Sequence, residues 1–212
     1  SQTEILESCK IALHNVETNS VIQPLMEALG YNTAKIDQGK ALLTTAKTLY
    51  ISNREQEDAK GRAYQKFENQ RNTIDSAYSL DRKKAKIVFK DNLTVFKELG
   101  LKGGLPRSYV KWLETISLFY NTLNNQPDVL SKLATLQVTP THVTEMLTAL
   151  DTLENARAAY IQAKGNAQNA TKTKNKAFKD LEKWMSNFYA VAKIALAQEP
   201  QLLESLGKLV KS

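Results

Sequence analysis

Apolar residues recur along the chain with the three- and four-residue spacing of amphipathic α-helices. The first run predicts a helix whose apolar face consists of Ile5, Leu6, Cys9, Ala12, Leu13 and Val16. A short helix then ends at Leu29-Gly30, where glycine suits a C-cap. The next run starts at Asn32 or Thr33, either of which can cap a helix, and its apolar face continues through Ile36, Leu43, Ala46 and Tyr50. This pattern predicts an all-α protein.

The same order of apolar runs returns later in the chain in a single register, without a gap. The constant offset, 107 positions, places Leu6 on Leu113, Ile36 on Val143 and Ile74 on Leu181. We therefore expect a tandem duplication, with one helical bundle over residues 1–102 and a second over residues 103–212. The two copies are joined near residues 102–108, where Gly103, Gly104 and Pro106 break any helix.

The apolar stripe of each copy fades over a polar middle, at residues 52–62 and 162–176. One interpretation is a single helix of nearly 60 residues, which would be ~85 Å long. The other is an antiparallel hairpin whose polar tip projects beyond the bundle. A compact domain of this length favours the hairpin, whereas good helix formers and the absence of proline in both polar middles keep the long helix open. The expected fold is a tandem duplication of an antiparallel, four-helix-like bundle with long helical hairpins.

Each copy closes with a related segment, AKIVFKDNLTVFKELG at residues 85–100 and AKIALAQEPQLLESLG at residues 192–207. Asp91-Asn92 and Glu199-Pro200 end a helix, and the short helix that follows has an apolar face that can cap the bundle end. These closing motifs resemble those of uncharacterised bacterial tandem helical-bundle proteins. The resemblance implies the fold and no established activity, so it transfers no functional residue.

Composition agrees with a soluble helical protein, because 8 glycines and 5 prolines in 212 residues are too few for a turn-rich β-architecture. No stretch has the ~18–20 uncharged apolar residues that a membrane span requires. Cys9 is the single cysteine and falls on the apolar face of the first helix, which predicts core packing. A chain without a disulfide suits the cytoplasm, while a cleaved leader, and with it secretion, stays open.

Catalytic and metal-binding patterns are missing. The two histidines form His14-x-x-Glu17 and His142-x-x-Glu145, which reverse the Glu-x-x-His order of bundle metal sites. Their separation differs from the repeat offset, so they are not a symmetric pair, and we expect both to be surface or interfacial residues. The glycines at 103 and 104 lack the spacing of a phosphate loop. The sequence thus predicts no catalytic residue, cofactor or metal, and a chain that is not an enzyme.

The strongest polar pattern is basic, in a chain of net charge +7. Candidate anion-binding residues form two helical stripes: Arg82, Lys83, Lys86 and Lys90, and then Lys172, Lys176, Lys179 and Lys183. Such stripes can follow phosphates, although the interspersed Asp180 and Glu182 favour a solvated face. Aromatic residues at helical spacing, Trp112, Phe119, Tyr120, Trp184, Phe188 and Tyr189, are expected in the core or between the copies.

Two functions follow from these patterns. We expect a non-enzymatic structural or protein-interaction module with an unidentified protein partner. The alternative is binding of nucleic acid or another polyanion through the basic stripes.

Overall fold

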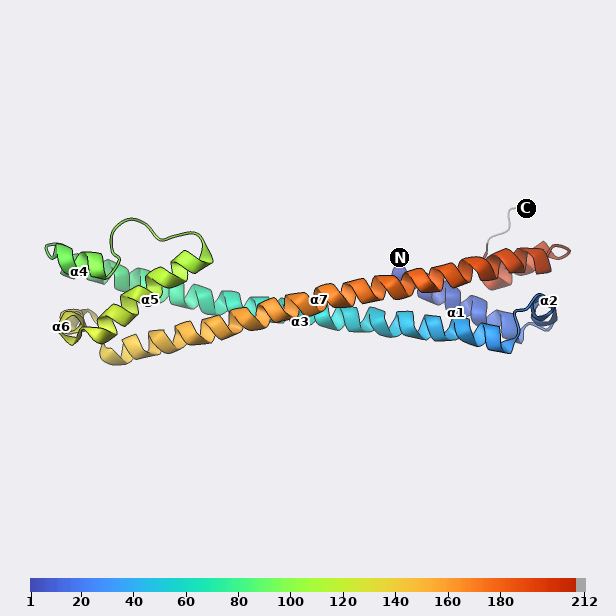
Figure 1. Cartoon of the computed structure of the whole chain (residues 1–212), viewed down its shortest axis with the longest axis horizontal. Coiled ribbons are helices and arrows are strands. Elements are labelled where there is room, and N and C mark those ends of the chain that lie inside the picture. Colours follow the sequence, from blue (N-terminus) through green and yellow to red (C-terminus); the bar gives the residue numbers. More distant parts are fainter. Residues whose placement is uncertain (209–212) are drawn as a thin grey trace. The chain divides into compact units, whose positions relative to one another are not determined.

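The computed structural model describes residues 1–208, which contain α-helices and short 3-10 helices but no strand (Figure 1). The all-α prediction is therefore confirmed. The elements in chain order are α1 (Gln2–Thr18), α2 (Ile22–Ala28), α3 (Thr33–Val88), α4 (Leu93–Glu98), α5 (Tyr109–Asn125), α6 (Pro127–Ser131), η1 (Ala134–Leu136), α7 (Pro140–Ala195) and η2 (Pro200–Leu206).

The helix lengths recur along the chain. Helices α1 and α5 have 17 residues each, and α3 and α7 have 56 residues each. The first and last residues of α5 and α7 lie 107 positions after those of α1 and α3. The same offset thus describes the apolar pattern of the sequence and the bounds of the four longest helices.

The predicted long helical hairpins are wrong, because α3 and α7 each run without interruption through the polar middle (Figure 1). Adding a residue to an existing helix costs little, and both polar middles consist largely of good helix formers without proline. Gly61 and Gly165 stay in the helix as well. Side chains of α3 and α7 pair within the polar middles, where Asn53 Nδ2 donates to Thr171 Oγ1 at 2.9 Å, and beside them, where the rings of Tyr64 and Tyr160 lie 5.2 Å apart.

The chain forms two compact units that differ from the two predicted repeats. Unit 1 comprises Ser1–Asp58 and Lys164–Ser212, and unit 2 comprises Ala59–Ala163. Each unit therefore contains one part of α3 and one part of α7. The predicted division at residues 102 and 103 concerns repeats in the sequence and stays a prediction; its second repeat also includes residues 209–212, which lie outside the described residues.

The helix starts that the sequence predicts are confirmed by their caps. Asn32 Oδ1 accepts from the backbone N–H of Lys35 at the start of α3, and Thr139 Oγ1 accepts from that of His142 at the start of α7. Gly30 follows α2 with φ +89°, a conformation that favours glycine.

Each unit has its own apolar core. The unit 1 core includes Cys9, which is 6% exposed, so the predicted core position is confirmed. Burial and the Glu182 carboxylate raise the pKa of the Cys9 thiol to about 11. The predicted aromatic set divides between the cores: Trp184, Phe188 and Tyr189 lie in unit 1, and Trp112, Phe119 and Tyr120 in unit 2.

The two long helices approach each other closely in unit 1 at a glycine. A Cβ atom added at Gly39 of α3 would lie 2.5 Å from Cη2 of Trp184 on α7. The Trp184 ring stacks on Phe188 at 5.6 Å and meets the edge of Tyr31 at 5.7 Å. Neighbouring rings therefore hold the indole in place, and only a residue without a side chain fits beneath it.

The variant Gly39→Ala is expected to lower the free energy of unfolding by about 1–3 kcal/mol, because overpacking outweighs the better helix propensity of alanine. Gly165→Ala is the matched control, since nothing lies within 4 Å of a Cβ at Gly165 in α7. The control should gain about 0.5–1 kcal/mol. Urea unfolding of both variants measures the two changes, and shifts of the same sign would contradict the packing described here.

Candidate functional site

The first predicted basic stripe lies in unit 2 and contains residues in different environments. Lys83 and Lys90 are exposed, whereas Arg82 and Lys86 are half-buried. The Arg82 guanidinium donates to the carbonyl oxygens of Leu101 at 3.2 Å and Gly103 at 2.7 Å. Arg82 thus holds the segment that follows α4, and the exposed lysines are the members of this stripe that can meet a partner.

The second predicted stripe lies on α7 in unit 1. Its four lysines, Lys172, Lys176, Lys179 and Lys183, are all exposed. Lys176 Nζ lies 3.1 Å from the Asp180 carboxylate, an exposed pair of the kind that water screens. The structure assigns the two predicted stripes to different compact units.

A polar cluster that the sequence did not predict occupies the core of unit 2. Asp81 is 2% exposed and lies on the inner face of α3, in helical phase with the buried Tyr78 and Ala85. A carboxylate in such a place is costly unless hydrogen bonds and opposite charges surround it. The side chains that contact Asp81 therefore decide whether its carboxylate is stable in the core.

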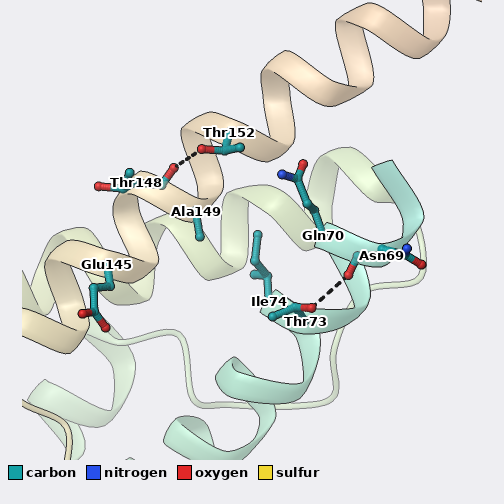
Figure 2. Close-up of a pocket in the computed structure, with 8 residues that line it drawn as sticks. All are labelled: Asn69, Gln70, Thr73, Ile74, Glu145, Thr148, Ala149 and Thr152. Carbon is teal, nitrogen blue, oxygen red and sulfur yellow. Dashed lines mark hydrogen bonds between the residues drawn. The ribbon is translucent and has the colours of Figure 1, made fainter. Parts of the chain in front are cut away.

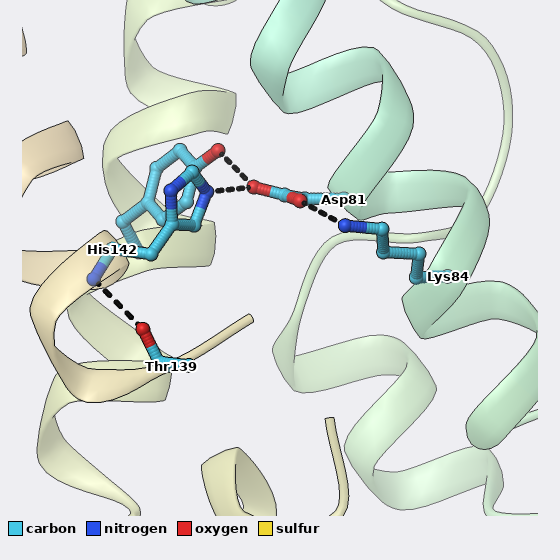
Figure 3. A network of polar contacts seen from close by, with 5 residues as sticks. Asp81, Lys84, Thr139 and His142 are labelled. Carbon is cyan, nitrogen blue, oxygen red and sulfur yellow. Dashed lines mark hydrogen bonds and ion pairs between the residues drawn. The ribbon is translucent and has the colours of Figure 1, made fainter. Parts of the chain in front are cut away.

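Three side chains contact the Asp81 carboxylate, which Figure 3 shows. The Tyr120 hydroxyl of α5 donates to Oδ2 at 2.9 Å, and Nε2 of His142, on α7, lies 2.6 Å from the same oxygen. Lys84 Nζ lies 3.3 Å from Oδ1, one turn further along α3. We call Asp81, Lys84, Tyr120 and His142 the Asp81 cluster. It joins three helices through one carboxylate.

The electrostatics of the cluster keep its phenol neutral. Burial, followed by the negative charge of Asp81 and the hydrogen bond to it, raises the pKa of Tyr120. A neutral Tyr120 is the donor that the carboxylate needs, while Lys84 supplies positive charge beside it. The arrangement is suited to holding α3, α5 and α7 in register.

The sequence carried a weak signal for this cluster. Asp81 interrupts an otherwise apolar helical phase, but charged residues are frequent on both sides of it. His142, predicted as a surface or interfacial residue, keeps 28% of its side chain exposed and directs Nε2 inward. Tyr120 was expected in the core and lies there, fully buried.

Unit 2 also has a groove between α3 and α7, of about 430 Å³ (Figure 2). Its lining consists of Asn69, Gln70, Thr73, Ile74, Glu145, Thr148, Ala149 and Thr152. The Thr73 and Thr152 hydroxyls donate to carbonyl oxygens one turn earlier in their own helices. Their hydroxyl protons are therefore engaged by the backbone and do not converge on the groove.

Within residues 1–208, no group of three or more His, Cys, Asp or Glu side chains is placed to hold a metal ion. Over the same residues, none of the helices combines the length and apolar character that crossing a membrane requires. Comparison of the chain with protein families, curated proteins and solved structures finds no match.

Removal of the central carboxylate is expected to destabilise the chain strongly. Asp81→Ala leaves the buried Tyr120 hydroxyl and the inward-facing Nε2 of His142 without their acceptor, which should cost about 3–5 kcal/mol in free energy of unfolding. The control Asp180→Ala removes an exposed carboxylate paired with Lys176 and should cost less than about 1 kcal/mol. Urea unfolding compares the two, and equal costs would show that the Asp81 cluster does not stabilise unit 2.

Alkaline pH should destabilise the wild-type chain more than Tyr120→Phe. The pKa of Tyr120 is raised in the folded state above the value of about 10 for an unfolded tyrosine. The neutral phenol therefore contributes fully to stability below about pH 10, and this contribution is lost as the pH rises toward the folded-state pKa. Urea unfolding at about pH 8 and about pH 11 measures the difference. An equal loss of stability in both proteins would count against this assignment.

Proposed function

We propose that the chain is a tandem duplication of an antiparallel helical bundle, acting as a non-enzymatic structural or protein-interaction module of the cytoplasm. The recurring helix bounds support the duplication, as do pairs of buried residues 107 positions apart: Val16 with Leu123, Met26 with Leu133, Ile36 with Val143, Ala85 with Ala192 and Leu99 with Leu206. Such agreement is expected when two copies inherit one core.

The antiparallel arrangement is supported by the order of contacts within each unit. In unit 1, the α3 residues Gly39 and Tyr50 meet Trp184 and Phe178 of α7. In unit 2, Phe67 of α3 stacks on Tyr160 of α7. Further along, Asp81 contacts His142. Partner numbers fall along α7 as residue numbers rise along α3, which is the order of contacts in an antiparallel helix pair.

The observation that carries the structural role is the Asp81 cluster. Its tyrosine, histidine and lysine each contact the buried Asp81 carboxylate, and these contacts tie α3 to α5 and α7. A carboxylate fixed by a buried tyrosine, a histidine and a lysine is committed to holding helices together. In a catalytic centre such side chains would face a substrate, whereas in unit 2 they pack helices against one another.

The long helices also present apolar side chains that a protein partner could cover. Ile51 of α3 in unit 1 and Ile161 of α7 in unit 2 are each about half exposed, at 49% and 53%. Large aliphatic side chains of this kind lose unfavourable contact with water when another protein packs on them. We use these two positions, one in each unit, to test for such a partner.

A photo-crosslinking residue placed at Ile51 or Ile161 of the full chain, in cells of the native source, tests this proposal. We expect ultraviolet light to join each variant to the same protein in repeated experiments. Asn155 is the matched control, because it is exposed on another face of α7 in unit 2. Adducts absent at both isoleucines, or equal at Asn155, would contradict a specific partner.

A second candidate is binding of nucleic acid or another polyanion. The exposed positions of Lys83, Lys90 and the four α7 lysines support it. Binding through lysines releases counterions, so affinity should fall by at least about tenfold between roughly 50 and 200 mM salt. An electrophoretic shift assay with nucleic acid at these two salt concentrations tests this candidate, and no salt-sensitive shift would count against nucleic acid as the polyanion.

A further inference from the structure

The last turns of α3 in unit 2 present a face that combines aliphatic and basic side chains. Leu80, Lys83 and Ile87 follow one another at spacings of three and four, and at 100° per residue they fall within an arc of about 60°. Lys90 continues the spacing in the turn after the helix. The opposite side of the same turns is the buried side, which carries Tyr78 and Ala85. We call Leu80, Lys83, Ile87 and Lys90 the outer face of α3.

Both aliphatic residues of the outer face are more exposed than core packing would leave them. Leu80 is 56% exposed and Ile87 is 69% exposed. Leu93, which begins α4, is 79% exposed in the same unit. Two exposed lysines accompany them. Lys90 Nζ lies 3.9 Å from the exposed Asp91 carboxylate, a pair that water screens, so the outer face still offers aliphatic surface and positive charge together.

The surrounding sequence strengthens the positive charge. Residues 80–111 contain nine basic residues, Arg82, Lys83, Lys84, Lys86, Lys90, Lys97, Lys102, Arg107 and Lys111. They contain three acidic residues, Asp81, Asp91 and Glu98, of which Asp81 is buried in its cluster. Arg82 and Lys84 are engaged by backbone carbonyls and by Asp81, and the remaining excess of positive charge favours a partner that carries negative charge.

The aliphatic residues of the outer face indicate which class of anionic partner fits it. Proteins that bind single-stranded nucleic acid stack bases on aromatic rings, whereas the large apolar residues of the outer face are leucine and isoleucine. An anionic lipid bilayer matches both properties, because lysines contact headgroup phosphates while aliphatic side chains enter the boundary between headgroups and acyl chains.

We propose that the outer face of α3 binds the surface of an anionic lipid bilayer. Leu80 and Ile87 enter the interface, and Lys83 and Lys90 lie against lipid phosphates. This inference rests on the second candidate function, polyanion binding, and names the class of partner. It requires no protein partner and no segment that crosses the membrane.

The chain contains an internal comparison for this face. At the repeat offset, its four positions correspond to Asn187, Ala190, Ile194 and Ala197, near the end of α7 in unit 1. Ile194 is 68% exposed, almost as much as Ile87, but alanines stand where the outer face of α3 has lysines. An equally exposed isoleucine without the lysines should not hold the chain on a bilayer.

Flotation of the full chain with lipid vesicles tests the proposal. We expect binding to vesicles of phosphatidylcholine with about one third phosphatidylserine, and at least about tenfold weaker binding to pure phosphatidylcholine. Leu80→Ser with Ile87→Ser, and separately Lys83→Gln with Lys90→Gln, should each weaken binding by about tenfold or more. The control Ile194→Ser should bind like the wild type, and circular dichroism should show all variants folded.

Each other result overturns the inference in a recognisable way. Equal binding to both kinds of vesicle, or an equal loss in Ile194→Ser, would show that the outer face of α3 is not the site. If only the lysine variant lost vesicle binding, the outer face of α3 would bind lipid phosphates without inserting Leu80 and Ile87 into the bilayer. A shift of nucleic acid without vesicle binding would keep the second candidate and reject the bilayer, and the absence of both would reject the bilayer and nucleic acid as partners.

Discussion

In each compact unit, a segment of α3 packs with a segment of α7, and a shorter helix, α1 in unit 1 and α5 in unit 2, contributes apolar side chains to the same core. In unit 2, for example, α3 contacts α5 through Tyr78 and Phe119 and contacts α7 through Phe67 and Tyr160. Helices owe most of their stability to packing of the apolar face rather than to intrinsic propensity. Close approaches such as Gly39 beneath Trp184, and ring contacts such as Phe67 with Tyr160, show how the pair is held.

Local signals in the sequence predict much of this fold, because they depend on neighbouring residues. Asn32, Thr139 and Gly30 mark helix ends through hydrogen bonds and backbone conformation that each residue type favours. The predicted hairpins are wrong because the choice between a hairpin and a single long helix rested on the expected compactness of a domain. The local signal, good helix formers without proline in both polar middles, favoured the long helix that the structure has.

The Asp81 cluster could not be predicted, because Asp81, Tyr120 and His142 come from three helices and only Lys84 is a local neighbour of Asp81. At the repeat offset, Asp81 corresponds to Phe188 and Tyr120 to Leu13, both buried in the apolar core of unit 1. If the chain is duplicated as proposed, one copy replaces an apolar contact by a polar one. We expect a buried polar group of this kind to favour one arrangement of the helices over others.

The division of the chain into units has a consequence for synthesis. Unit 2 is continuous in sequence, so all of its residues are present once residue 163 has left the ribosome. Unit 1 cannot fold completely until the segment that begins at Lys164 has been synthesised. Closing unit 1 over an unfolded intervening chain would cost loop entropy, and a folded unit 2 shortens that loop. The order of translation therefore favours folding from the middle of the chain outward.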